Sequence, residues 1–277
     1  AIWDSIIYRE LNAKNIIVPP NRQKMKSSYP GGYVKDPYVG AHDWVVSFDL
    51  NSLYPNLIVQ YNMSPETLIG GKTFPHGVDY YLEKDCDTEG VSVAANGSAY
   101  TKEFQGILPK IIENYYEERS VIKKSMLLAQ QAYEKNKTIE LEREINQLEN
   151  RQMAIKILLN SLYGALGNQY FRYFDMRIAE GITLSGQLSI RWAENAINDE
   201  MNKLMDTLGQ DYVIAIDTDS LYINFGPLVD KLNPKDTVKT LSKICEEHFE
   251  KVLEKSYSKL FKKMNAYKPR MVMAREA

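Results

Sequence analysis

Two aspartates lie in a short polar stretch between two apolar runs in the last third of the chain. Residues 212–225 read Y-V-I-A-I-D-T-D-S-L-Y-I-N-F, and the β-branched and aromatic flanks predict a β-hairpin. Asp217 and Asp219 are two positions apart, so on an extended backbone both carboxylates would leave the same face. Oxygen ligands of this kind suit Mg²⁺, but Asp and Ser are also common turn residues. This stretch alone leaves a metal site and an acidic turn equally open.

A further carboxylate ends a second predicted strand. Residues 44–48, W-V-V-S-F, form an apolar run, and Asp49 stands at its end. Residues 50–55 then lead into a helix, with Pro55 in the first turn, where proline is tolerated. Unpaired N–H groups at such a helix start bind phosphate oxygens well. Asp49 therefore supplies the second acidic strand end that a metal site at the hairpin needs.

Basic side chains recur at helical spacing in the middle of the chain. We expect one helix from Pro109 to about residue 131 and another from about 138 to 163, antiparallel because the polar link is short. The candidates are Arg119 and Lys123 on the first helix, and Lys156, Asn160, Tyr163 and Gly164 on one face of the second. A solvated charged surface is the alternative, and we accept it for Lys124, Lys135 and Lys137. Lys156 differs, because it lies among apolar neighbours and is expected to need an anionic partner.

The remaining patterns complete a mixed fold. We expect an amphipathic helix at 1–18, a hairpin with strands at 91–94 and 99–101, and a strand at 271–273. Long helices are expected at 178–208 and 238–264. Together with the acidic hairpin, these elements predict an α+β fold. Its antiparallel sheet would be packed by long helices, and a two-helix hairpin would be added to it.

Composition restricts the class of protein. The chain has 277 residues, 44% of them hydrophobic and 25% charged, as in ordinary globular proteins. A net charge of −2 gives no global signature for nucleic acid, so only local charge can indicate that partner. Two cysteines without paired spacing and three histidines argue against a zinc cluster. No run approaches membrane-spanning length, so no membrane partner and a cytoplasmic, intracellular location are expected. The start without methionine suggests an excised piece or half of a split enzyme.

Three separate motifs resemble one family. Residues 49–55, D-L-N-S-L-Y-P, resemble the D-x-x-S-L-Y-P motif of family B DNA polymerases, and residues 156–164, K-I-L-L-N-S-L-Y-G, resemble their K-x-x-x-N-S-x-Y-G helix. Residues 217–220, D-T-D-S, are similar to the family's palm hairpin. The Y-x-G-G/A and R-x-x-x-K elements are matched at 29–32 and 119–123, and three further segments look like the T-even phage branch: 64–67, 160–168 and 275–277. The resemblance covers nearly the whole chain.

The resemblance implies a domain plan and a reaction. A palm would be formed by residues 1–108 and 164–277, and a fingers hairpin by residues 109–163. The expected reaction is template-directed transfer of a nucleotide from a dNTP to a primer 3′-hydroxyl with two Mg²⁺ ions. The expected partners are DNA primer–template, dNTP, and exonuclease and thumb segments outside this sequence. A phage-encoded chain of this kind would work inside an infected host cell.

The resemblance also assigns roles to residues. Catalysis would depend on Asp49, Asp217 and Asp219, with the metals held by Asp49, Asp219 and Leu50. The nucleotide would be bound by Leu50, Ser52, Leu53, Tyr54, Arg119, Lys123, Lys156, Asn160, Tyr163 and Gly164, and Tyr54 would exclude a ribose 2′-hydroxyl. DNA would be contacted by Tyr29, Gly31, Gly32, Thr218 and Glu276.

Two departures and two rival readings accompany the resemblance. Ala215-Ile216 stand where the family usually has Tyr-Gly before D-T-D-S, and Asn56 replaces a usual serine. One rival is a non-catalytic polymerase half that acts only with partner chains. The other is a different two-metal nucleotidyltransferase, such as an RNA-priming enzyme, against which Tyr54 argues because its bulk disfavours ribonucleotides.

Overall fold

A five-stranded antiparallel sheet organises the molecule, which is known from a computed structural model describing residues 2–21, 25, 27–71 and 73–276. The strand order is β1-β5-β6-β2-β7, so β2 lies between β6 and the last strand of the chain. The strands are β1 (Val34–Lys35), β2 (Val45–Leu50), β5 (Val213–Asp217), β6 (Ser220–Asn224) and β7 (Met273–Arg275). Together with the long helices described next, this antiparallel sheet confirms the predicted α+β class.

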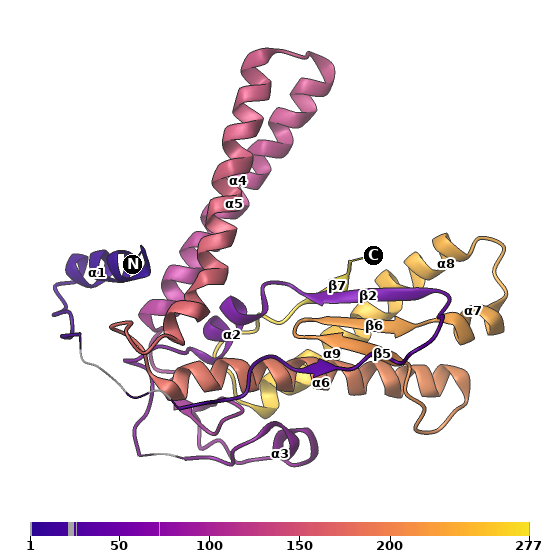
Figure 1. The fold of residues 1–277 in the computed structure, drawn as a ribbon, viewed down its shortest axis with the longest axis horizontal. Helices are drawn as coiled ribbons and strands as arrows, with labels where there is room; N and C mark the ends of the chain where they lie inside the picture. The colour runs from indigo at the N-terminus through magenta and orange to yellow at the C-terminus, as the bar shows by residue number, and fades with distance from the viewer. Residues whose placement is uncertain (1, 22–24, 26, 72, 277) are drawn as a thin grey trace.

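Two long helices cover one side of the sheet (Figure 1). They are α6 (Met176–Met205) and α9 (Glu250–Lys263), and Leu188, Ile197 and Leu253 are among their buried residues. The single helix expected at 238–264 is instead α8 (Thr237–Ile244), a π-helical turn η1 (Cys245–Phe249) and α9. The buried residues of this segment lie four positions apart: Leu241, Cys245, Phe249, Leu253 and Tyr257. On an ideal α-helix of about 3.6 residues per turn, side chains at this spacing rotate progressively around the helix. The wider π turn restores their common face.

The expected helical hairpin is present and projects away from the sheet (Figure 1). It consists of α4 (Ile107–Lys135) and α5 (Ile139–Leu166), both a few residues longer than the sequence pattern indicated. The Thr138 hydroxyl caps α5 by accepting the Leu141 N–H at 3.3 Å, which ends the link and starts the return helix. The short helix α2 (Leu53–Tyr61) lies almost wholly buried at the base of the hairpin, beside the sheet.

The smaller elements differ more from expectation. The amino-terminal helix α1 (Ile2–Ala13) is shorter than predicted, and the Trp3 indole N–H ties it to α5 by donating to the Leu158 carbonyl and the Ser161 hydroxyl. The second hairpin contains only β3 (Ser92–Val93) and β4 (Ala99–Tyr100). Sequence patterns missed α3 (Val78–Glu83), α7 (Gly226–Leu232) and the edge strand β1. No helix within the described ranges is long and apolar enough to cross a membrane.

Candidate active site

The register of the sheet brings two acidic segments together. Asp49 is the fifth residue of β2, where it faces Ser220 of β6 on one side and Ala274 of β7 on the other. The Ser220 hydroxyl donates to the Asp49 carboxylate at 2.9 Å. The Leu50 N–H donates to the Asp219 carbonyl, also at 2.9 Å. Asp49 on β2 and Asp219, directly before β6, are therefore held next to each other, although 170 positions separate them in the sequence.

The premise of an extended backbone through Asp217 and Asp219 was wrong. Asp217 pairs with Ser220, so Thr218 and Asp219 form a two-residue turn, and Thr218 has a left-handed φ of 55°. The Thr218 N–H donates to the Tyr33 carbonyl at 2.9 Å. A Cβ atom on Gly32 would lie 2.7 Å from the Thr218 hydroxyl, so glycine permits the close approach of this segment to the turn.

The electrostatics of the acidic residues are unfavourable without a cation. Burial raises the pKa of the Asp219 carboxyl above its usual value, and the negative charges of Asp49, Asp217 and Glu276 raise it further. Within the described ranges, no three His, Cys, Asp or Glu side chains form a ready-made metal cluster. Two carboxylates with room for water and phosphate oxygens nevertheless fit Mg²⁺, which seldom takes an all-protein cage.

A cavity of about 410 Å³ opens beside the two carboxylates. Asp49, Asn51, Ser52, Leu53, Tyr54, Pro55, Lys156, Asn160, Thr218 and Asp219 line it. Ser52 precedes α2 in a left-handed conformation with φ 46° and ψ 59°, and its side chain does not cap the helix. The first N–H groups of α2 therefore begin at the cavity wall, beside a lysine and an amide from α5. Such a surface suits a polyphosphate.

The structure brings only some of the predicted residues into this cavity. Arg119 instead donates through Nε to the Gln152 side chain at 3.2 Å, and neither it nor the exposed Lys123 lines the cavity. Gly164 lines a separate shallow depression with residues 27–28 and 167–170. Leu50 is 1% exposed, so only its backbone can serve a ligand.

Lys156 reaches the cavity for a different reason from the predicted one. Its neighbours Met153 and Ile157 are 41% and 63% exposed, so the apolar letters around it do not form a buried shell. Ile155 and Leu159 face the core instead. Lys156 is exposed on the face of α5 that looks toward the acidic residues, and burial does not force an anionic partner on it.

Tyr54 is held by packing on two sides. Its ring lies 4.5 Å from the ring of Tyr163, centroid to centroid, and a Cβ on Gly186 of α6 would lie 3.3 Å from its Cε1. Burial, then the charge of Asp219 and the nearby Tyr29 ring, raise the pKa of Tyr54, so the phenol stays neutral. A side chain confined in this way can act as a fixed wall of the cavity.

Several residues of the site were missed at the level of sequence. Asn51 and Pro55 line the cavity, Ser220 bonds to Asp49, and Gln152 holds Arg119. Pro55 and Ser220 are specified letters of the D-x-x-S-L-Y-P and D-T-D-S motifs, and Asn51 lies at an unspecified position of the first motif, so the motifs were the available signal for these three residues. Gln152 has no such signal, because it depends on how α4 packs against α5.

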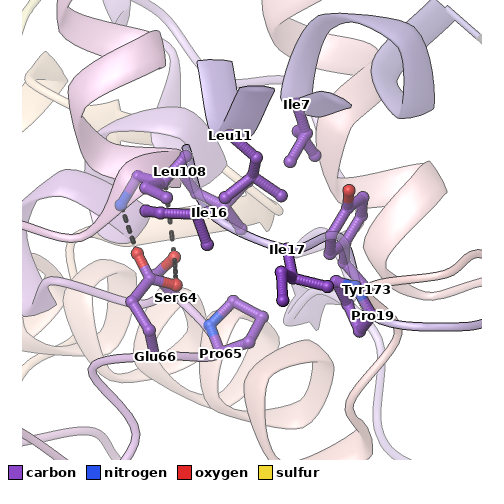
Figure 2. A pocket seen from close by; sticks show the side chains of 11 residues that line it. Ile7, Leu11, Ile16, Ile17, Pro19, Ser64, Pro65, Glu66, Leu108 and Tyr173 are labelled. Carbon is purple, nitrogen blue, oxygen red and sulfur yellow. Dashed lines mark hydrogen bonds between the residues drawn. The ribbon is translucent and has the colours of Figure 1, made fainter. Parts of the chain in front are cut away.

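A second cavity has no comparable chemistry. It measures about 200 Å³ and lies between α1, residues 16–19 and the start of α4. Figure 2 shows Ile7, Leu11 and Ile17 around it. Both oxygens of its one acidic side chain, Glu66, accept hydrogen bonds, from the Ile107 N–H and the Ser64 hydroxyl. We therefore place the candidate site at the acidic cavity.

Comparison with known proteins identifies the family of the chain. The model of DNA polymerase family B matches residues 3–270. The chain is 32% identical to the DNA-directed DNA polymerases of Escherichia phage RB69 and Enterobacteria phage T4, over 99% of this chain and 36% of each relative. DNA polymerase 1 of Pyrococcus abyssi is 34% identical over 72% of this chain and 22% of its own length. The chain spans about a third of the first two relatives. Because the family model matches nearly the whole chain, a range that includes Asp49, Lys156 and Asp219 of the cavity, this chain belongs to DNA polymerase family B.

Proposed function

We propose that this chain is the palm and fingers part of a DNA-directed DNA polymerase. The fingers would be residues 109–163 and the palm residues 1–108 and 164–277. The observation that carries the proposal is one cavity that is lined by Asp49 of β2, by Asp219 of the turn between β5 and β6, and by Lys156 and Asn160 of α5. It combines oxygen ligands for cations with donors for phosphate, as nucleotidyl transfer from a dNTP requires.

The residues of the chain divide the work of holding the substrate. Asp49 and Asp219 are the residues that would hold two Mg²⁺ ions, with the Leu50 backbone beside them and Asp217 and Glu276 contributing negative charge. The chemistry supplied by the bound ions would be a lowered pKa of the primer hydroxyl and neutralisation of the leaving pyrophosphate. The backbone of residues 50–53 and the side chains of Lys156 and Asn160 would orient the triphosphate.

The hairpin contributes further groups when it moves. Arg119 and Lys123 lie on α4 outside the cavity, and we propose that rotation of the α4–α5 hairpin brings them onto the triphosphate. Tyr163 and Gly164 would then pack near the nascent base pair. DNA would follow the surface formed by Tyr29, Gly31, Gly32, Thr218 and Glu276. Within it, Gly32 lies against the turn between β5 and β6, and the Gly31 carbonyl accepts a hydrogen bond from Gln187 of α6.

Tyr54 would select the sugar. Its ring is fixed between Tyr163 and α6, so it cannot withdraw easily from an added hydroxyl. A wall of this kind disfavours ribonucleotides by steric exclusion.

A primer-extension assay tests the proposal. The chain is supplied with primer–template DNA, dNTPs and Mg²⁺, with and without a chain that carries a thumb segment. We expect template-directed incorporation that Asp49→Asn abolishes and that Lys135→Ala, at the hairpin tip, leaves intact. Incorporation that survives Asp49→Asn, or that ignores the template, would refute the proposal.

A non-catalytic role is the second candidate. The chain spans only 36% of the phage relatives, and the remaining duplex-binding surface could come from other polypeptide segments. On this reading the chain binds Mg²⁺–dNTP weakly and extends a primer only when the thumb-bearing chain is added. Extension by the chain alone at physiological salt would exclude it.

A further inference from the structure

Asn56, one of the two departures from the family pattern, lies at the centre of a buried hydrogen-bond chain. It is 4% exposed in the first turns of α2. Its Nδ2 donates to the Asn51 carbonyl at 2.6 Å, and its Oδ1 accepts from Arg270 Nε at 3.1 Å. A carbonyl can only accept and a guanidinium can only donate, so the orientation of the amide is fixed by its partners. Both ends of the Asn56 amide are therefore engaged.

The bond to the Asn51 carbonyl determines which way the next N–H group points. The carbonyl of Asn51 and the N–H of Ser52 belong to one planar trans peptide, so they point in opposite directions. The carbonyl is drawn toward buried Asn56. The Ser52 N–H is therefore directed away from the core, on the side where residues 51–55 line the cavity.

Asn51 is also restrained through its N–H group, and the next residue, Ser52, has a strained backbone. The Asn51 N–H donates to the Val272 carbonyl at 3.1 Å, just before β7. Ser52 has left-handed backbone angles, which cost a non-glycine residue about 1 kcal/mol or more unless the surroundings impose them. Without the Asn56 bond, the Asn51 carbonyl loses the side-chain donor that opposes rotation of the 51–52 peptide out of this conformation.

Arg270 connects this restraint to the base of the helical hairpin. Its guanidinium lies 5.4 Å from the centre of the Tyr116 ring and 3.7 Å from the Glu113 carboxylate, both on α4. The backbone N–H groups of Arg270 and Met271 both donate to the Gln60 side chain, at 3.0 and 3.2 Å. The partner that Asn56 uses is thus itself held in place by α2 and α4.

We propose that Asn56 is a positioning residue for nucleoside triphosphate binding. It holds the Asn51 carbonyl inward, so that the Ser52 N–H stays available to a phosphate oxygen. This inference rests on the proposed function of the cavity. A serine at this position has a shorter side chain and a single polar atom, so it cannot bridge the Asn51 carbonyl and Arg270 in the same way.

Kinetics of three variants test the inference. Asn56→Asp places a carboxylate oxygen against the Asn51 carbonyl while it keeps the acceptor for Arg270, and Asn56→Ser removes the bridge. Asn202→Asp is the matched control. Asn202 Nδ2 donates to two main-chain carbonyls, those of Asn198 and Gln210, near the far end of α6, outside the cavity. We expect KM for dNTP to rise about 10-fold in Asn56→Asp and less in Asn56→Ser, with a smaller change in kcat. Asn202→Asp is expected to lower Tm without changing KM.

Hydrogen exchange provides a readout that does not require activity. The backbone amide of Asn51, which donates to the Val272 carbonyl, should exchange faster in both Asn56 variants than in wild type, and not in Asn202→Asp. Unchanged exchange there would overturn the positioning role. An active wild type with an unchanged KM in Asn56→Asp would also overturn it while leaving the proposed function intact. A wild type that neither binds Mg²⁺–dNTP nor extends a primer with the thumb-bearing chain would refute the function itself, and with it the role toward triphosphate.

Discussion

Replacing Asp219 by asparagine should inactivate the site and stabilise the fold at the same time. Burial and the charges of Asp49, Asp217 and Glu276 raise the pKa of Asp219, so ionising it in the folded chain is unfavourable. Asp219 directly precedes Ser220, the cross-strand partner of Asp49, so we take the two carboxylates to be roughly 7 Å apart, a separation typical of neighbouring side chains on paired strands. At an effective dielectric constant of about 20–40, one such like-charge pair opposes folding by ~1–2 kcal/mol, before screening by salt.

The expected stability change is therefore a gain of about 1 kcal/mol at neutral pH, or roughly 2–4 °C in Tm. Its sign with pH follows from the raised pKa. The folded chain binds the Asp219 proton more tightly than the unfolded chain does, so the penalty is complete above the folded pKa and disappears as pH falls through it. The difference between Asp219→Asn and wild type should shrink accordingly in acid.

Thermal unfolding with and without Mg²⁺ shows whether Asp219→Asn changes stability through the charge of the carboxylate or through side-chain packing. At about 100 times its Kd, a bound ion stabilises the folded state by ~2.7 kcal/mol, so Mg²⁺ should raise the Tm of wild type and reverse the order of the two proteins. Asp230→Asn, an exposed control in α7, should change neither value. In the extension assay, Asp219→Asn should lose about 10²–10³-fold or more in kcat/KM.

One pattern of results would refute this reasoning. If Asp219→Asn lowers Tm at neutral pH and responds to Mg²⁺ as wild type does, then Asp219 is a structural residue of the turn. The acidic cavity would in that case lose its assignment as the cation site.

Three further outcomes follow from the geometry. Tyr54→Ala should raise ribonucleotide relative to deoxyribonucleotide incorporation, measured in competition, and unchanged discrimination would make Tyr54 only a packing residue. Lys156→Ala should reduce kcat/KM by about 2–4 kcal/mol in free energy, while Lys135→Ala changes little; equal effects would indicate general positive charge rather than a placed contact. Lys35→Met should destabilise the fold by ~3 kcal/mol, because Lys35 is the partner of Glu194 and Asp211. Because the pKa of Asp211 is lowered in the folded chain, the stability that this network contributes should be lost as pH falls through that pKa. A free energy of unfolding in urea that does not change over this acidic range would count against the network.

Local sequence patterns predicted the helices and strands better than the turns and irregular segments that connect them. Apolar runs at 44–48 and 212–225 gave strands, and periodic segments gave the two helices of the hairpin, within a few residues. The left-handed Thr218 and the π turn at Cys245–Phe249 escaped prediction. Both depend on tertiary packing, against which local propensity is only a weak indicator.

Sequence analysis found those residues of the candidate site that belong to a motif and whose own side chains line the cavity. Asp49, Tyr54, Lys156 and Asn160 were identified in this way. The site was not predicted where a residue acts through a distant partner. Nothing near Asn56 in the sequence indicates Arg270, which lies 214 positions away. Sequence spacing describes faces of single elements, and such a pair belongs to no single element.

This distribution of contacts has a consequence for how the cavity forms. Asp49 bonds to Ser220 across 171 positions, and Asn51 is held by the segment before β7, near the end of the described chain. Loop closure over such separations must precede these bonds, so the complete cavity cannot be built by one local segment alone. The carboxylates also repel each other, which leaves the rest of the fold to hold them together. The bonds from Ser220, Asn56 and β7 therefore set the geometry of the cavity before any ligand arrives, as a preorganised site requires.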